Sequence, residues 1–390
     1  MSPEVHAVAP DVIGVVADDF TGAADSAGTF ARHGWTVRLL VGAAKPPRTT
    51  SAELRTVVAI ATGSRSMSEV DAAAATSRAV HRLAAAGAQR LFVKIDSTLR
   101  GPVAGQVQGA LEVWGDDARV VVAPAFPAQG RTVINGVVLV DGVPVSETAS
   151  GRDPFAPVAS DHLADLFPGF RRLALDGRGL PAPTRTWADA ATDRELDAVA
   201  EVIGAEPDAV AVGSAGLAGA LARRWSHPSP PTDAGAVRGE VIVIVTSLHP
   251  VSALQMAELA ASAPPGVDLV TPPVRRESDP ARVADQIAER VSALVRARRV
   301  DALVVVGGDG VAAVLDSLGA TGILVDDVLE TGCPTGTIVG GIADGTRIVT
   351  KSGGFGTPQT LVDLVSRLRR GPSGPDRLPR PADPKEDHHD

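Results

Sequence analysis

The chain has 390 residues, too many for one ordinary core, and its length suggests two domains. Hydrophobic residues make up 44% and charged residues 21% of the sequence, close to the globular average, which excludes disorder of the chain as a whole. Only 3% of the residues are aromatic and the net charge is −9, so neither nucleic acid nor an anionic membrane is an expected partner.

Short runs rich in Val, Ile and Leu alternate with Ala-rich stretches along the whole chain. This alternation predicts an α/β fold of two domains, each with a mostly parallel sheet flanked by helices. The predicted strands are Ile13–Ala17, Thr36–Val41, Val57–Ala61, Leu91–Ile95, Val120–Ala123, Val210–Val212, Val241–Val245, Ala302–Val306 and Arg347–Thr350. The predicted helices are Ala23–Arg32, Glu69–Ala85, Val103–Trp114, Leu217–Trp225, Val251–Ala261, Ala281–Arg298, Val311–Leu318 and Gln359–Leu368.

The stretch from Ser226 to Gly235 breaks this pattern, since it contains three prolines and no apolar periodicity. It predicts a linker, residues 226–239, between an N-terminal domain, residues 1–225, and a C-terminal domain, residues 240–370. Residues 371–390 are rich in proline and charge and are expected to be disordered.

The first polar turn, Asp18-Asp19-Phe20-Thr21-Gly22, follows a predicted strand and opens a helix. Ligands of open α/β sheets bind beyond the carboxyl ends of the strands. Two carboxylates there can accept hydrogen bonds from a polyol or hold a cation, and the helix N-terminus favours an anion. The simpler alternative is that Asp19 or Thr21 only caps the helix.

Three further strand ends of the N-terminal domain carry cations and hydroxyl groups. Arg65 follows the third strand and could bind a carboxylate or a phosphate, although an arginine there is often only a solvated loop residue. The fourth strand and its turn supply Lys94, Asp96, Ser97, Thr98 and Arg100 within seven residues. Arg131 follows the fifth strand, and residues 136–145 then predict a hairpin with an Asp-Gly turn.

Glycine-rich turns follow three other strands, at residues 213–216, 307–310 and 351–356. Glycines there let backbone N–H groups approach a phosphate closely. Neither G-x-x-x-x-G-K-[ST] nor G-x-G-x-x-G occurs. Ser247, at the end of the first C-terminal strand, could also touch a ligand, whereas His249 is expected to be structural.

Cys333 is the only cysteine, which excludes an internal disulfide and a multi-cysteine metal site. No metal ligands are assigned from the sequence. The N-terminus lacks the pattern of a secretory signal, and no run reaches the roughly 18 apolar residues of a membrane span. We therefore expect a cytoplasmic protein with small-molecule ligands, and a homo-oligomer is left open.

Four motifs together resemble the four-carbon acid sugar kinase family, ATP-dependent enzymes that act on threonate, erythronate and 3-oxo-tetronate. They are Asp18-Asp19-Phe20-Thr21-Gly22, Lys94-Ile95-Asp96-Ser97-Thr98-Leu99-Arg100-Gly101, Ala125-Phe126-Pro127 with Gly130-Arg131, and Lys351-Ser352-Gly353-Gly354-Phe355-Gly356. They occur in family order and span nearly the whole predicted folded region.

The resemblance implies that the N-terminal domain binds the acid sugar and the C-terminal domain binds Mg-ATP. The implied sugar ligands, with the neighbouring cations, are Asp18, Asp19, Arg65, Lys94, Asp96, Ser97, Thr98, Arg100 and Arg131. The implied nucleotide ligands are Ser247, Gly307, Gly308, Asp309, Gly310, Lys351, Gly353 and Gly354.

Phosphoryl transfer also needs a group that accepts the hydroxyl proton. Asp18, Asp19 and Asp96 are the candidates, and Asp96 is favoured because Lys94 and Arg100 would keep it ionised. The acid's carboxylate would pair with Arg65 or Lys94. Closure of the domains across the linker would exclude water.

One position departs from the family pattern, in which Thr or Ser commonly follows the Gly-Gly-acidic run. Here Gly310 is followed by Val311, so a hydroxyl that could touch a phosphate is absent. Two alternatives are kept: another small-molecule kinase with a similar glycine turn, such as an NAD or diacylglycerol kinase, and a non-catalytic sensor of sugar acids.

Overall fold

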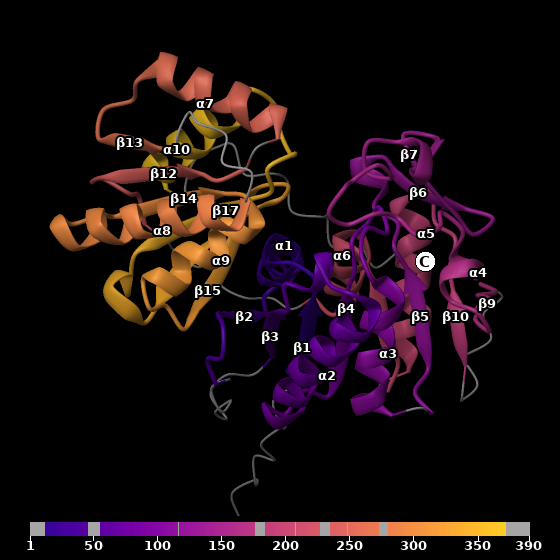
Figure 1. Ribbon diagram of the computed structural model, residues 1–390. Helices are drawn as coiled ribbons and strands as arrows, with labels where there is room; N and C mark the ends of the chain where they lie inside the picture. Colours follow the sequence, from indigo (N-terminus) through magenta and orange to yellow (C-terminus); the bar gives the residue numbers. More distant parts are fainter. Residues whose placement is uncertain are drawn as a thin grey trace, which may run out of the picture.

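The computed structural model describes residues 12–45, 55–115, 117–175, 184–206, 208–226, 235–247, 249–272 and 280–371. They form an N-terminal lobe, residues 12–226, and a C-terminal lobe, residues 235–371, that lie side by side (Figure 1). Most of the expected linker and nearly all of the expected disordered tail lie outside the described residues. The described part of the linker includes Val237, which is buried and donates its N–H to the Leu368 carbonyl.

All nine predicted strands are present, and further strands join them. The N-terminal lobe contains β1 (Val12–Ala17), β2 (Thr36–Leu40), β3 (Thr56–Ala61), β4 (Arg90–Lys94), β5 (Val120–Ala123), β9 (Arg171–Arg172), β10 (Arg185–Trp187) and β11 (Val210–Gly213). The C-terminal lobe contains β12 (Val241–Val245), β13 (Val267–Val270), β14 (Ala302–Val306), β15 (Gly322–Glu330), β16 (Cys333–Val339) and β17 (Arg347–Lys351).

These strands form one sheet of 14, in the order β13-β12-β14-β17-β16-β15-β2-β3-β1-β4-β11-β5-β10-β9. Each lobe contributes a mostly parallel set, which confirms the predicted fold class. The two sets are joined where β15 pairs antiparallel with β2, with Val325 opposite Val37. The predicted hairpin forms a separate small sheet from β6 (Arg131–Ile134), β7 (Val137–Val140) and β8 (Val143–Pro144).

Helices cover the sheet in both lobes. In the N-terminal lobe, α2 (Glu69–Ala85) packs on α3 (Val103–Trp114), while α6 (Ala215–Arg224) packs on α1 (Phe20–Arg32) and α5 (Asp193–Ala205); α4 (Leu163–Leu166) is short. In the C-terminal lobe, α7 (Pro250–Ser262) packs on α10 (Thr360–Arg370), and α8 (Pro280–Ala297) packs on α9 (Gly308–Ser317). No helix in this described part of the chain is long and apolar enough to cross a membrane.

Helix α1 belongs to the N-terminal lobe but packs also on the C-terminal lobe. It contacts β15, β16 and α9, and Figure 1 shows it between the two lobes. Its apolar face, including Ala27 and Phe30, is buried in a core that continues from one lobe into the other. The start of α1 therefore lies where the two lobes meet.

Candidate functional site

Two carboxylates lie at the carboxyl end of β1. Asp19 is the N-cap of α1 and accepts hydrogen bonds from the Gly22 N–H (2.8 Å) and the Thr21 hydroxyl (2.7 Å). Asp19 therefore caps α1, and its Oδ1 also lies 3.0 Å from Arg65 Nη2. Asp18 is almost completely buried and does not cap the helix. Helix capping therefore does not explain why a carboxylate stands at position 18.

Arg65 joins three carboxylates, two from the turn after β1 and one from the turn after β4. A short turn after β3, Ser64–Ser66, presents its guanidinium group. Arg65 Nη2 lies 2.6 Å from Asp18 Oδ2, 3.0 Å from Asp19 Oδ1 and 3.5 Å from Asp96 Oδ1. Burial alone would lower the pKa of Arg65, but the three carboxylates raise it well above its usual value. Arg65 is thus a permanent charge at the centre of the cluster.

Asp96 is held firmly in the turn after β4. Arg100 Nε donates to Asp96 Oδ2 (2.8 Å) and Arg100 Nη2 donates to Asp96 Oδ1 (3.0 Å), and the Thr98 hydroxyl also donates to Oδ2. Burial would raise the pKa of Asp96, but Arg65 and Arg100 outweigh burial and hold it well below its usual value. Ser97, in the same turn, is partly exposed.

Lys94 and Asp18 form the buried floor of the cluster. The Lys94 ammonium donates to the Ile95 carbonyl (2.7 Å) and lies 3.8 Å from Asp18 Oδ1. That oxygen is buried and has no hydrogen-bond partner within the described chain. Burial raises the pKa of Asp18 despite the opposing charges of Arg65 and Lys94. A buried oxygen without a donor is a position that a ligand hydroxyl group can satisfy.

Arg131 begins β6 at the margin of this cluster. It is partly buried, and burial lowers its pKa although Asp141 and Asp96 act in the opposite direction. Its side chain donates to the Gln129 carbonyl, and it forms no ion pair with any described carboxylate. The structure thus brings most of the predicted sugar-binding residues together: Asp18, Asp19, Arg65, Lys94, Asp96, Thr98 and Arg100, with Arg131 nearby.

The turns that the sequence predicts to bind the nucleotide also lie next to one another in the C-terminal lobe. Gly307 precedes α9 with a φ of 111°, a conformation that L side chains rarely adopt. A Cβ atom on Gly353 would overlap the Ser247 side chain, so the turns after β12 and β17 are in contact. Within the described residues, no side chain caps the start of α9. Its first N–H groups are therefore suited to bind an anion.

Lys351 ends β17 and begins the last of these turns. It is completely buried, and its ammonium donates to the Ser352 carbonyl (2.8 Å). Burial lowers its pKa to about 8. Asp309 lies in the first turn of α9, and its side chain is outside the described part of the chain. Gly354 lies beside the His249 ring.

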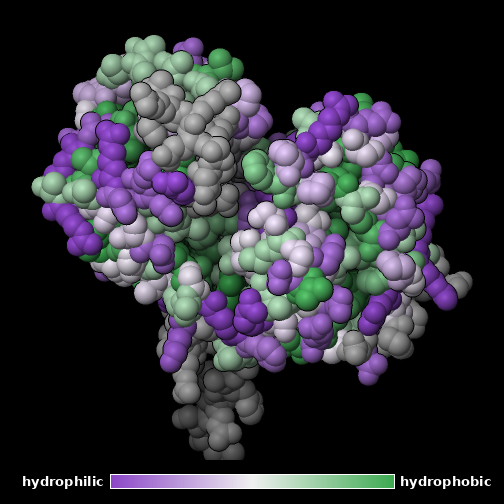
Figure 2. Space-filling view, viewed as in Figure 1, coloured by the Kyte–Doolittle hydropathy of each residue, from purple (hydrophilic) through white to green (hydrophobic). Residues whose placement is uncertain are grey.

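The two groups of turns meet at Gly308. A Cβ atom placed on Gly308 would lie 3.3 Å from Thr21 Oγ1 and 3.4 Å from Asp19 Oδ2. The carboxylate cluster of the N-terminal lobe therefore borders directly on the glycine turn that starts α9. The space-filling view shows the surface hollowed between the two lobes (Figure 2). No group of three or more His, Cys, Asp or Glu side chains suited to a metal ion occurs in the described ranges.

Comparison with known proteins matches a different family model to each lobe. Residues 13–169 match a family described as a sugar-binding N-terminal domain, and residues 270–361 match a nucleotide-binding C-terminal domain. The chain is 38% identical, over 92% of its length and 97% of the relative's, to a D-threonate kinase of Bordetella bronchiseptica. This chain belongs to the four-carbon acid sugar kinase family. Other members carry the names D-erythronate kinase, as in Heliobacterium modesticaldum (26% identical, 91% and 96% covered), and 3-oxo-tetronate kinase.

Solved structures of acid sugar kinase relatives share the fold. A Bordetella bronchiseptica structure with bound citrate, described as a domain-swapped dimer, is 37% identical and aligns with a TM-score of 0.52 over 92% of this chain and 98% of its own. A Haemophilus influenzae structure is 20% identical, with a TM-score of 0.68 over 91% of this chain and 100% of its own.

One contact of the carboxylate cluster was not predicted from the sequence. Asp153 accepts a hydrogen bond from Arg100 Nη1 (3.2 Å), although it lies in a loop without a strand–turn–helix pattern. Conversely, the turn at residues 213–216 was wrongly grouped with the phosphate sites. Ser214 is completely buried and donates to the Ala125 carbonyl (2.6 Å), so the turn is a packing feature.

Proposed function

We propose that the protein is an ATP-dependent kinase that phosphorylates a hydroxyl group of a four-carbon acid sugar. The observation that carries this proposal is the contact between the carboxylate cluster and the glycine turn at Gly308. Phosphoryl transfer requires the acceptor hydroxyl and the phosphate to meet in this way. The names of the relatives support the substrate class, and D-threonate is the first compound to test because the 38% identical relative carries its name.

Each lobe binds one of the two substrates. In this proposal the N-terminal domain, residues 1–225, binds the acid sugar, and residues 240–370 bind the nucleotide, with residues 226–239 as the linker. Because ATP is a cytoplasmic substrate, we place the enzyme in the cytoplasm.

Arg131 is our choice for the cation that receives the acid's carboxylate. Arg65 and Arg100 are already bound to carboxylates of the protein, whereas Arg131 binds only a carbonyl group among its described neighbours. A guanidinium group binds a carboxylate through two parallel hydrogen bonds. Asp18 Oδ1, buried and without a donor, is then placed to accept a hydrogen bond from a sugar hydroxyl.

Asp19 is better placed than Asp96 to accept the hydroxyl proton. A proton acceptor must first reach the attacking group, and geometry outranks pKa in this choice. Asp19 borders Gly308, and its oxygens accept hydrogen bonds from the Gly22 N–H and the Thr21 hydroxyl. Both oxygens of Asp96 are instead held by the charged guanidinium group of Arg100. We therefore favour Asp19, with Asp96 fixing Arg65 and Arg100, which is the reverse of the order expected from the sequence. Of the two carboxylates after β1, Asp19 is the one next to Gly308, so we assign Asp18 to sugar binding and not to proton transfer.

The nucleotide phosphates would bind to the start of α9 and to the turns at Ser247 and Gly353. Backbone N–H groups that no described side chain caps, and glycines packed against neighbouring turns, fit such a ligand. Mg²⁺ would neutralise charge on the phosphates, and it is commonly held by one or two carboxylates together with the phosphates themselves. Asp19, the carboxylate next to this turn, is taken as the proton acceptor, so the ion would be held mainly through the phosphates.

A panel of substrates separates this function from its alternatives. The purified protein is mixed with ATP and, separately, with D-threonate, D-erythronate, their L-isomers, 3-oxo-tetronates and NAD, and ADP release is measured. We expect release with at least one tetronate and none with NAD. Release with NAD alone would indicate the alternative kinase, and tetronate binding without turnover would indicate a sensor.

The site lies between the lobes, so it could also be completed by a second chain. We propose that this protein forms a dimer by exchange of lobes, as described for the Bordetella bronchiseptica structure. That relative aligns with a lower TM-score than a 20% identical structure, as expected when similar lobes are arranged differently. The two described lobes are consecutive in the sequence, residues 12–226 and then residues 235–371, so each can be exchanged as a unit.

Complementation tests this assembly. Asp19→Asn inactivates the N-terminal half of the site and Gly308→Val the C-terminal half, so an exchanged heterodimer contains one intact site and one site with both changes. Co-expression of the two variants should restore about a quarter of the wild-type activity if the chains mix at random. Activity that stays at the level of the separate variants would contradict the exchange.

A further inference from the structure

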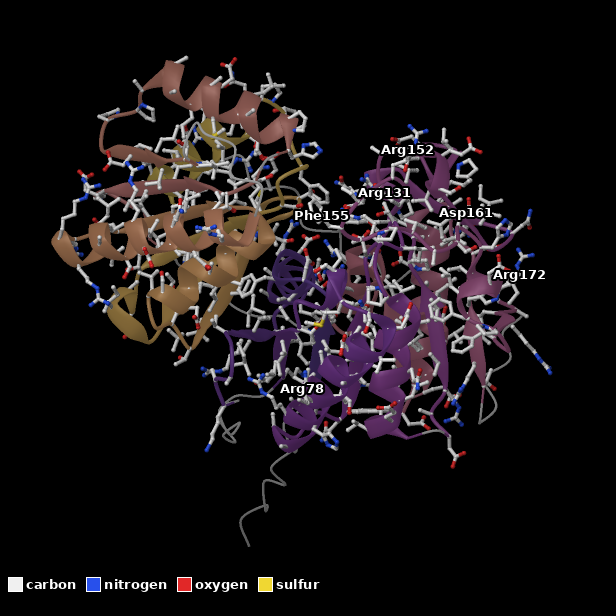
Figure 3. The ribbon with its side chains drawn as sticks, in the orientation of Figure 1. Arg78, Arg131, Arg152, Phe155, Asp161 and Arg172 are labelled. Carbon is white, nitrogen blue, oxygen red and sulfur yellow. The ribbon has the colours of Figure 1, made fainter. Side chains whose placement is uncertain are left out.

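A loop of the N-terminal lobe presents an aromatic ring to solvent beside the site. Phe155 is 67% exposed and is the only aromatic residue among the large exposed hydrophobic residues of the described chain. Burial of such a side chain would stabilise the fold, so its exposure has a cost in stability. In Figure 3 Phe155 lies at the edge of the gap between the lobes, closer to the C-terminal lobe than the other labelled residues.

The backbone around Phe155 is fixed by one carboxylate. Asp153 Oδ1 accepts hydrogen bonds from the N–H groups of Phe155 (2.9 Å) and Ala156 (3.1 Å). These two bonds close the loop into a compact turn and set the direction in which the ring leaves the backbone.

The same carboxylate connects the loop to the sugar-binding cluster. Asp153 Oδ2 accepts a hydrogen bond from Arg100 Nη1 (3.2 Å), and Arg100 in turn binds both oxygens of Asp96. A backbone bond from Gly101 to the Pro157 carbonyl (3.3 Å) holds the far end of the loop. The backbone that carries the ring is therefore tied to the carboxylate cluster through Asp153 and Arg100.

We propose that Phe155 covers the bound acid sugar on the side of the C-terminal lobe and keeps water away from the transferring phosphoryl group. This inference rests on the proposed function and deepens it. A phenyl ring neither donates nor accepts an ordinary hydrogen bond, so it offers water no anchor, while the C–H groups of a four-carbon chain can pack against its face. Asp153 is the positioning residue that holds the ring in place.

The competing reaction is hydrolysis of ATP. In that reaction a water oxygen forms the bond to the γ-phosphorus, the bond to the bridging oxygen breaks, ADP leaves, and the water proton passes to solvent. With the ring in place, the sugar hydroxyl is the only nucleophile at the site, and one ADP is released for each phosphorylated sugar acid.

Phe155→Ala tests this role, and the exposure of the side chain means that the variant should fold like the wild type. We expect the ratio of ADP released to sugar acid phosphorylated to rise from about one to several, and KM for the sugar acid to rise about tenfold with KM for ATP unchanged. Asp153→Asn, which keeps the ring but weakens its attachment, should raise the same ratio to a smaller extent. Val70→Ala, which shortens another exposed apolar side chain on α2, is the matched control and should change neither quantity.

The outcomes distinguish this inference from the proposed function. If the wild type phosphorylates a tetronate and Phe155→Ala keeps a ratio of one with unchanged KM values, the role of Phe155 is overturned while the function stands. If the wild type phosphorylates no tetronate, the proposed function itself is contradicted. Phe155→Leu, which restores an apolar side chain, should bring the ratio back toward one.

Discussion

Asp19, the N-cap of α1, borders on Gly308, the first residue of α9, so that a methyl group on Gly308 would lie 3.4 Å from Asp19 Oδ2. The two residues belong to different lobes and to the starts of two helices. Both helix N-termini carry partial positive charge, and their meeting point favours a group with concentrated negative charge, such as a transferring phosphoryl group. The same two lobes are joined by the pairing of β2 with β15.

Asp19→Asn should remove the proton acceptor while leaving the shape of the turn intact. We expect kcat to fall by about 100- to 10,000-fold, the usual contribution of general-base catalysis, with only a small change in KM for the sugar acid. Asp96→Asn is the comparison, and it should chiefly raise KM because Asp96 organises Arg65 and Arg100. Initial rates of ADP release measure both effects. The reverse pattern would restore Asp96 as the proton acceptor.

Arg65→Ala should destabilise the fold, because it leaves three carboxylates without their shared cation. Removing one partner of a buried ion pair typically costs about 3–5 kcal/mol in the free energy of unfolding. Arg65→Lys keeps the charge but not the planar fork, and an intermediate loss is expected. Urea unfolding at pH 7 measures these differences.

The cost of Arg65→Ala should also depend on pH. The depressed pKa of Asp96 stabilises the wild type above the ordinary carboxylate pKa of about 4, and this contribution is lost as the pH falls through the depressed value. The difference between the wild type and Arg65→Ala should therefore shrink in acid. A difference that is constant from pH 7 to pH 3 would show that Arg65 does not act through these carboxylates.

Gly353→Ala should weaken nucleotide binding, because the added methyl group would overlap the Ser247 side chain and displace one of the two turns. We expect KM for ATP to rise about tenfold or more, whereas KM for the sugar acid stays near its wild-type value. Gly345→Ala in the same lobe is a useful control, since a methyl group there meets nothing within 4 Å, although its positive φ brings some strain of its own. Equal effects on both substrates would argue against a nucleotide role for this turn.

Asp25 provides a pH-dependent test of the lobe interface. It lies on α1, and burial raises its pKa to about 6 despite the nearby Lys94 and the N–H of Gly332. A raised pKa means that its stabilising contribution is present below the unfolded value of about 4 and is lost as the pH rises through 6. Asp25→Asn should therefore raise Tm at pH 8 and change it little at pH 4. The same change in Tm at both pH values would contradict this account.

Much of the fold could be predicted from the sequence, because strands buried on both faces appear as continuous apolar runs. Strands β15 and β16 were missed for a physical reason: Asp326 and Asp327 interrupt the first, and Pro334 and Gly336 interrupt the second. Both are antiparallel to their neighbours, and only the fold shows that they join the lobes.

The site residues, like the strands, could be predicted only in part from the sequence. Polar residues directly after strands were predicted, because parallel strands bring their carboxyl ends to one edge of the sheet. Asp153 was not predicted, because its loop returns to Arg100 through tertiary contacts that local spacing does not reveal. The choice between Asp19 and Asp96 likewise depends on the distance to Gly308, which belongs to the other lobe.

The most direct test of the central claim is the identity of the product. The purified protein is incubated with ATP and D-threonate, with D-erythronate and a 3-oxo-tetronate in parallel, and the sugar acid is analysed by mass spectrometry while ADP is quantified. The account predicts a monophosphorylated four-carbon acid from at least one of these compounds, in a one-to-one ratio with ADP, and its loss in Asp19→Asn. Absence of a phosphorylated acid from every tetronate, with a folded protein that binds ATP, would contradict it.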